Sequence, residues 1–303
     1  MDIVKLKPAV KDYIWGGQKL KNYGKTASSD IIAETWELSF RPDAPTLIDS
    51  GPHSGEPLYK VAKKEDIGSN PASFPFFPVL IKLINSADNL SVQVHPGDDY
   101  ALANEHSFGK TEMWHVLDAE PGCGLYVGFK RKVNKEEVAK AMEDGTILDL
   151  LNFFEVKPGE TYFIPSGTVH AIGKGITVIE IQQNSDLTYR LYDYNRIGKD
   201  GKKRPLHIQK GLDVIRFEPY SPVKCDLPLI GKTTYFASYL KTVDEEELVK
   251  AKEDSYASIT VLEGSGTFDG ISFHKGDSFF IPASKGGLLK GKATFVLTET
   301  SLL

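Results

Sequence analysis

The chain has 303 residues, of which 41% are hydrophobic and 25% are charged, as in an ordinary globular protein. Lys and Arg number 36 against 41 Asp and Glu, so the formal net charge is −5. This balance argues against a nucleic-acid partner, because proteins that bind phosphate backbones carry a basic excess or a basic stripe. The composition also excludes a disordered chain, a collagen and a disulfide scaffold. At roughly 150 residues per domain, the length predicts two domains or one large one.

The sequence favours a cytoplasmic protein without a membrane partner. Its two cysteines, Cys123 and Cys225, lie far apart and lack metal-type spacing, so a reducing compartment is the simplest setting. The first residues carry no apolar signal core. The most apolar run, residues 74–84, is too short and too interrupted by proline and lysine to span a bilayer.

Glycine and proline punctuate many short runs that have the character of β-strands. These runs alternate in polarity or are rich in β-branched and aromatic residues, and they cover residues 35–39, 90–95, 160–164 and 177–181. Many short strands between turns are typical of an antiparallel sandwich or barrel, so we expect a mainly β fold.

Helical patterns are few, and they cover residues 60–67, 98–105 and 135–151. The last has apolar residues at roughly helical spacing and a capping residue in Asn134, although Gly145 lies inside it. The charged stretch 199–205 is interpreted as a solvated turn rather than a binding patch.

The sequence contains an internal repeat, since residues 157–167 align without a gap with residues 274–284. Upstream, residues 114–122 have a plausible counterpart in residues 258–266. Two unrelated hairpins remain the alternative explanation. The repeat predicts that one two-strand unit occurs twice, in a first domain over residues 1–215 and a second over residues 216–303.

Four polar residues of the first domain form a candidate metal site. Gln93 and His95 are two apart, so a strand would place both on one face. Glu112 and His170 complete a ligand set that suits a first-row divalent metal. A lone histidine in a β protein is usually a surface or hydrogen-bonded residue, so each member alone is weak evidence. The second repeat lacks these ligands, and we expect it to be free of metal and structural.

The spacing that ends at His170 carries a family resemblance. Residues 159–170 match Gly-x5-Pro-x-Gly-x2-His, which resembles the second cupin motif, although its final Asn is missing. In the first motif, Gln93 and His95 replace the usual pair of histidines, and the glutamate follows an insertion. These features and the segments 13–17, 109–114 and 184–190 resemble the type I mannose-6-phosphate isomerases, in their short bacterial branch. The motifs cover residues 13–196 in the family's order.

The resemblance implies a double cupin, that is, two jelly-roll barrels with a few helices inserted in and around the first. It implies one divalent metal, usually Zn²⁺, bound by Gln93, His95, Glu112 and His170. The implied reaction interconverts mannose 6-phosphate and fructose 6-phosphate through a cis-enediol. One carboxylate and neutral donors would leave the site a formal positive charge, which favours an enediolate.

The resemblance also assigns residues around the metal. Arg190 corresponds to the family's active-site arginine, although a surface ion pair with Asp186 or Asp193 is the structural alternative. Lys82, Ser91 and Lys110 match positions on the substrate side and are candidates for phosphate and hydroxyl contacts. Glu180 is a candidate for the proton-transfer base, and a metal-bound water, Lys110 or His115 are the alternatives.

Three functional interpretations follow. The first is a metal-dependent aldose–ketose isomerase with a small sugar phosphate as its partner. The second is another metal cupin, such as a dioxygenase or an isomerase of a different sugar phosphate. The third is a non-catalytic cupin that binds a sugar phosphate. A monomer and a homodimer are both compatible with the sequence.

Overall fold

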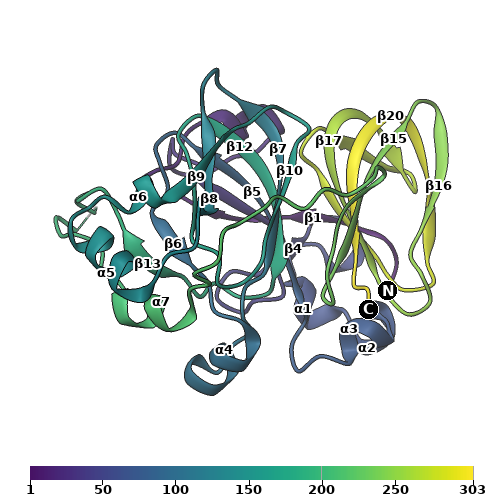
Figure 1. Cartoon of the computed structure of the whole chain (residues 1–303). Helices are drawn as coiled ribbons and strands as arrows, with labels where there is room; N and C mark the ends of the chain where they lie inside the picture. Colours follow the sequence, from purple (N-terminus) through teal and green to yellow (C-terminus); the bar gives the residue numbers. More distant parts are fainter. Residues whose placement is uncertain (199, 303) are drawn as a thin grey trace.

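The computed structural model describes residues 1–198 and 200–302, and its strands form three antiparallel sheets (Figure 1). This confirms the expected mainly β fold, while the description as two jelly-roll barrels stays a prediction. None of the helices in the described part of the chain is long and apolar enough to cross a membrane.

Two of the sheets face one another around a shared core. The six-stranded sheet has the order β10 (Thr161–Ile164), β7 (Glu112–Ala119), β12 (Ile176–Gln183), β5 (Val79–Ser86), β3 (Glu34–Leu38) and β2 (Ala9–Lys11). The five-stranded sheet has the order β13 (Tyr189–Tyr192), β6 (Val92–Val94), β11 (His170–Ile172), β8 (Gly124–Phe129) and β9 (Leu151–Glu155). Buried Trp114 and Val116 of β7 pack with Leu125 and Val127 of β8, so apolar burial holds the two sheets together.

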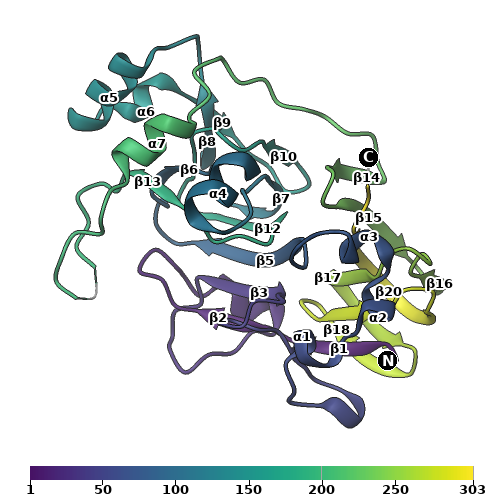
Figure 2. The ribbon, with the colours of Figure 1, turned by 90° about the horizontal axis from the view of Figure 1, so that it is seen from below.

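The third sheet has nine strands and contains both ends of the chain. Its order is β14 (Leu229–Lys232), β15 (Ala237–Val243), β20 (Gly286–Glu299), β17 (Ala257–Phe268), β19 (Ser278–Ile281), β1 (Val4–Lys7) and β4 (Leu47–Ile48), with β16 (Glu246–Lys250) beside β20 and β18 (Ile271–His274) beside β17. Because β1 pairs with β19, the N-terminal strand belongs to the C-terminal sheet (Figure 2). A division of the chain at residue 215 therefore leaves β1 and β4 on the wrong side, and the rest of that division stays a prediction.

The helices lie mostly at the ends of the sheets. Three of them, α5 (Lys135–Glu143), α6 (Ile147–Leu150) and α7 (Ile208–Val214), gather on the five-stranded sheet, away from the nine-stranded one (Figures 1 and 2). The others are α1 (Leu58–Val61), α2 (Lys64–Ile67), α3 (Ser69–Ala72) and α4 (Asp98–Glu105), with two 3-10 turns at Lys19–Tyr23 and Gly51–His53.

The predicted helices are confirmed in part. The helix over residues 98–105 is confirmed as α4. Asn134 caps α5 by accepting a hydrogen bond from the backbone N–H of Glu137, but the predicted helix over 135–151 is broken into α5 and α6. Gly145 takes a left-handed φ of 73° at the break, which an α-helix does not tolerate. The pattern over 60–67 likewise spans two single-turn helices.

Strand pairing supports the internal repeat and corrects its register. Ile164 of β10 lies opposite Glu112 of β7, and the equivalent Ile281 of β19 lies opposite Ala257 of β17. Alanine therefore stands in the second unit where the first has a candidate metal ligand. The expected match of 114–122 with 258–266 is therefore shifted by one residue from the match that strand pairing gives. Strand pairing fixes this register, whereas a sequence alignment does not.

A buried polar cluster joins β3 to the nine-stranded sheet. Glu37 is fully buried, and its carboxylate lies 2.8 Å from the Lys25 ammonium. It also accepts hydrogen bonds from the hydroxyls of Thr35 (2.6 Å) and Ser278 (2.8 Å). Lys25 in turn donates to the carbonyl of Gly276 at 2.6 Å. We call these residues the Glu37 cluster; they satisfy a charge pair that would be costly to bury alone.

We expect Glu37→Ala to lower the free energy of unfolding by about 3–5 kcal/mol, because it leaves the Lys25 ammonium buried without its partner. Urea unfolding of the purified proteins measures this change. The matched control is Lys19→Ala, which removes a half-exposed ion pair with Asp118 (2.7 Å) and should cost about 1 kcal/mol or less. Equal losses in the two variants would contradict a stabilising role for the Glu37 cluster.

Candidate metal centre and active site

A cavity of about 410 Å³ opens between the six-stranded and five-stranded sheets. Its lining includes six of the residues predicted from the sequence, namely Lys82, Ser91, Gln93, Lys110, Glu180 and Arg190. The lining is rich in charge, since five basic and four acidic side chains border it. A cavity of this size with convergent polar groups is typical of a small-molecule site.

Strand register explains why residues far apart in the sequence meet in this cavity. In the five-stranded sheet, Gln93 of β6 lies directly between Arg190 of β13 and His170 of β11. Residues opposite each other in neighbouring antiparallel strands project from the same face of the sheet. The three side chains therefore form one row across the sheet, and they come from positions up to 97 residues apart in the sequence.

The six-stranded sheet presents a second row. Trp36 of β3 pairs with Lys82 of β5, Lys82 pairs with Glu180 of β12, and Glu180 pairs with Trp114 of β7. All four of these side chains line the cavity. The site thus consists of two cross-strand rows on facing sheets, and the fold fixes their composition.

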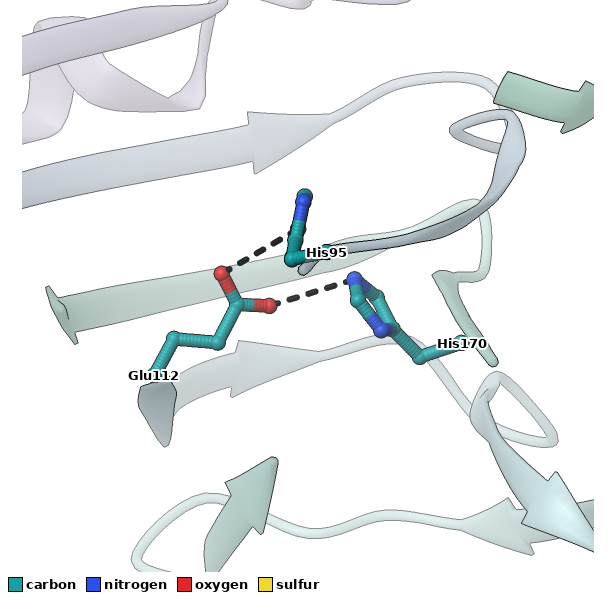
Figure 3. Close-up of side chains that lie close together, drawn as sticks. All are labelled: His95, Glu112 and His170. Carbon is teal, nitrogen blue, oxygen red and sulfur yellow. Dashed lines mark ion pairs between the residues drawn. The ribbon is translucent and has the colours of Figure 1, made fainter. Parts of the chain in front are cut away.

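His95, Glu112 and His170 lie together behind this lining, and one potential ligand atom from each lies within 4.8 Å of those of the other two (Figure 3). All three are almost completely buried. Nε2 of His170 is 3.2 Å from one oxygen of Glu112, and Nε2 of His95 is 3.5 Å from the other. The structure therefore brings together three of the four predicted metal ligands.

Hydrogen bonds set the orientation of both imidazoles. The Nδ1–H of His95 donates to the carbonyl of Leu187 (2.7 Å), and the Nδ1–H of His170 donates to the carbonyl of Thr168 (2.8 Å). Burial lowers the pKa of His170 to about 4 and holds the pKa of His95 well below its usual value, so both rings are neutral. Each ring thus directs the lone pair of Nε2 toward Glu112, as a metal ligand requires.

The surroundings of Glu112 fit a cation. Both of its oxygens are buried, and neither accepts a hydrogen bond from a residue in the described part of the chain. The Lys110 ammonium, 2.9 Å away, is its nearest positive group. Burial raises the pKa of Glu112 above its usual value, and Lys110 opposes that rise. One carboxylate and two neutral imidazoles in such a dry position are a donor set suited to a divalent metal.

Gln93 lies next to this triad, but its amide nitrogen rather than its oxygen faces it. The nitrogen is 3.3 Å from Nε2 of His170, and the oxygen accepts a hydrogen bond from the Ser91 hydroxyl at 3.4 Å. A half-turn of the carboxamide exchanges the two atoms and would direct the oxygen to a metal. The ligand role of Gln93 therefore stays a prediction.

Glu180 is held as a carboxylate by its neighbours. It accepts hydrogen bonds from the Lys82 ammonium (3.0 Å) and from the indole N–H of Trp114 (2.8 Å). Burial alone would raise the pKa of Glu180, but Lys110 and Lys82 outweigh it and hold that pKa well below its usual range. Such a carboxylate is a weak base. Its surroundings therefore disfavour the predicted role of Glu180 in proton transfer.

His115, an alternative base, points elsewhere. It is buried, its Nδ1 lies 2.8 Å from the Thr161 hydroxyl, and it is absent from the cavity lining.

Arg190 borders the cavity and forms no ion pair with an acidic residue of the described part of the chain. Its guanidinium donates to the carbonyl of Pro205 at 3.1 Å, and its buried Nε–H has no hydrogen-bond acceptor among the described residues. Asp186 pairs instead with Arg41, and Asp193 pairs with two other arginines. The structural alternative for Arg190, an ion pair with one of these aspartates, is therefore not what residues 1–198 and 200–302 show.

The sequence interpretation missed several lining residues, among them Lys11, Glu34, Trp36 and Arg204. Strand alternation could have indicated that Glu34 and Trp36 share a face, since they are two apart. The stretch 199–205 was expected to be a solvated turn, and this is wrong for Arg204, which lines the cavity. Residue 199 lies outside the described residues.

Comparison with known proteins agrees with this geometry. A family model described as "Phosphomannose isomerase type I, catalytic domain" matches residues 3–113. The chain is 34% identical over 315 residues to a Bacillus subtilis protein named as probable mannose-6-phosphate isomerase GmuF, with 97% of this chain and 98% of that protein covered. It is 36% identical over 282 residues to the mannose-6-phosphate isomerase of Streptococcus mutans, with 89% of each covered.

A solved structure gives the same result. The crystal structure of mannose 6-phosphate isomerase from Bacillus subtilis superposes with a TM-score of 0.87 at 30% sequence identity, covering 98% of this chain and 99% of that one. Similarity at this level of identity and coverage extends over both the site and the C-terminal sheet. The chain therefore belongs to the family of type I phosphomannose isomerases.

Proposed function

We propose that the protein interconverts mannose 6-phosphate and fructose 6-phosphate. The observation that carries this proposal is the position of the buried His95–Glu112–His170 triad, directly behind a cavity lined by Lys82, Lys110 and Arg190. An aldose–ketose isomerisation needs an electrophile for the developing oxyanion, donors for the hydroxyls and a cationic group for the phosphate. The cavity offers groups of all three kinds.

We propose Zn²⁺ as the metal, held by His95, Glu112 and His170 with the Gln93 oxygen as a fourth ligand. A divalent ion bound there would supply electrostatic stabilisation of negative charge on the sugar oxygens. The triad carries one formal negative charge, so the loaded site has a formal charge of +1. That sign favours an enediolate over a neutral sugar.

The side chains around the triad bind and orient the sugar. The ammonium groups of Lys82 and Lys110 and the hydroxyl of Ser91 reach the cavity and donate hydrogen bonds to sugar oxygens. Arg190 holds negative charge through a guanidinium that stays protonated at every working pH. Glu180 serves as the fixed counter-charge that keeps Lys82 in place, rather than as the base.

The setting of the reaction follows from the chain as a whole. We propose that the protein acts in the cytoplasm as a monomer or homodimer. Its formal net charge of −5 supports the absence of a nucleic-acid partner.

We expect isomerase activity to vanish when EDTA removes the metal and to return when zinc is added. A coupled assay on mannose 6-phosphate, run on the as-purified, stripped and restored protein, measures this.

His170→Ala should lose both metal and activity, because two imidazoles and Glu112 form the binding triad. His53→Ala is the matched control, since His53 is an exposed histidine that pairs with Glu56. Full metal content without turnover would contradict the proposed substrate.

Arg190→Ala should keep its metal and lose turnover, because this residue borders the cavity without contacting the triad. Metal analysis and the same assay separate the two effects. The expected loss in kcat/KM is about tenfold to a hundredfold, as for a charged hydrogen bond of about 1.5–3 kcal/mol. Near-normal turnover would show that Arg190 has no part in the reaction.

We expect Glu180→Gln to destabilise the metal-free protein more at neutral pH than in acid. The low pKa of Glu180 adds stability above the pKa of an unfolded glutamate, about 4.3, and that stability is lost as the pH falls through the folded value. Urea unfolding of the wild type and of Glu180→Gln at about pH 7 and about pH 3 measures this. The difference between their free energies of unfolding should be smaller in acid.

The control for this experiment is Glu137→Gln, at an exposed pair with Arg131. Its free energy of unfolding should differ little from that of the wild type at either pH, since surface ion pairs contribute little to stability. If the loss in free energy of unfolding for Glu180→Gln did not depend on pH, this would contradict the conclusion that Glu180 is held as a carboxylate.

A further inference from the structure

We propose that Arg204 is a second guanidinium at the phosphate-binding end of the cavity, beside Arg190, and that buried Asp193 positions it. The proposal rests on the proposed function, because it names the groups that hold the phosphate of the sugar. The observations behind it are the hydrogen bonds and charges of the segment 193–207, which follows β13.

The chain around Arg204 is tied directly to Arg190. The Arg190 guanidinium donates to the carbonyl of Pro205 (3.1 Å). The backbone N–H of His207 donates to the carbonyl of Arg190 (2.7 Å), and the backbone N–H of Arg190 donates to Nδ1 of His207 (3.1 Å). Three bonds therefore fix the segment that carries Arg204 against the strand residue that borders the cavity. As a result, both arginines line the same cavity.

Asp193 sets the direction of the Arg204 side chain. Its carboxylate is almost completely buried, and it accepts hydrogen bonds from Nε (2.8 Å) and Nη2 (2.6 Å) of Arg204. This two-point contact fixes the plane of the guanidinium. The Nη1 group and the second hydrogen of Nη2 are not used by Asp193. These are the donors that an anion in the cavity would meet.

The charges at this end of the cavity favour an anion. Arg196 and Arg204 both pair with the buried carboxylate of Asp193, whereas Arg190 makes no ion pair with it among the described residues. Both guanidinium groups line the same cavity, and burial and the positive charge of Arg204 lower the pKa of Arg190. A dianion with several acceptor oxygens, such as a phosphate group, would accept from both Arg190 and Arg204.

The position of the pair suits a sugar phosphate. Arg190 and His170 are separated by one strand, β6, and a strand spacing of about 4.8 Å puts their backbones roughly 10 Å apart. A hexose phosphate carries its reacting carbons and its phosphate at opposite ends. The arginine pair can therefore hold the phosphate while the reacting carbons lie near the triad.

Arg196 provides a matched comparison, because it binds the same carboxylate but points away. Its Nη2 lies 2.5 Å from Asp193, and its Nη1 contacts Asp88 (3.3 Å) and the carbonyl of Asn89 (2.5 Å). It stacks on Tyr194 and is not among the cavity-lining residues. If a substitution weakened substrate binding only by disturbing Asp193, the same weakening should appear in variants of both Arg196 and Arg204.

The test compares Arg204→Gln with Arg196→Gln in steady-state kinetics on mannose 6-phosphate. We expect Arg204→Gln to raise KM by about tenfold or more, because one charged hydrogen bond is lost, with a smaller change in kcat. Arg196→Gln should leave KM within about twofold of the wild type, because Arg196 does not line the cavity. Arg204→Lys, which keeps the charge and loses the fork, should give an intermediate KM and serves if Arg204→Gln does not fold.

A second measurement separates this proposal from the proposed function. Calorimetric titration of the zinc-loaded proteins with inorganic phosphate requires no turnover. Weaker phosphate binding in Arg204→Gln alone would support the arginine pair, even if the wild type failed to isomerise mannose 6-phosphate. Unchanged KM and unchanged phosphate binding in both Arg204 variants would overturn the proposal. Equal losses in Arg204→Gln and Arg196→Gln would also overturn it, because they would assign the effect to Asp193.

Discussion

The register of two facing antiparallel sheets is the constraint on which the site depends. One sheet aligns Arg190, Gln93 and His170 in a row, and the other aligns Trp36, Lys82, Glu180 and Trp114. A slip of one residue in any of these pairings would turn the whole strand and move its polar side chain to the other face. Apolar packing between the sheets, around Trp114 and Val127, therefore protects the chemistry as well as the fold.

The charges in and behind the cavity are distributed unevenly. Near the triad, the buried carboxylates of Glu34, Glu112 and Glu180 outnumber the ammonium groups of Lys82 and Lys110. A divalent ion would convert that deficit of one charge into an excess of one. The guanidinium groups of Arg190 and Arg204 also line the cavity. Under the proposed function, this distribution of charge favours a sugar phosphate with its reacting carbons toward the triad.

The C-terminal sheet contributes to the site through β3, although Ala257 replaces the candidate ligand there. Glu34 and Trp36 line the cavity, whereas Glu37 belongs to the Glu37 cluster and accepts hydrogen bonds from Lys25 and Ser278. The same short strand therefore carries the wall of the cavity on one face and the Glu37 cluster on the other. Because a buried charge pair tolerates little displacement, the nine-stranded sheet limits how far this wall can move.

Local patterns in the sequence were sufficient for part of the site and could not supply the rest. His170 ends a turn motif of fixed spacing, and the alternation of a strand places Gln93 on one face, so these positions were predictable. Helix α5 was predictable from its cap, but whether it ends before Gly145 or continues through that glycine depends on packing. Arg204 lies in a charged stretch that has every property of a solvated turn. The hydrogen bonds between its segment and Arg190, 14 positions earlier in the chain, and its contact with Asp193 hold it at the cavity, and such non-local contacts leave no periodic signal in the sequence.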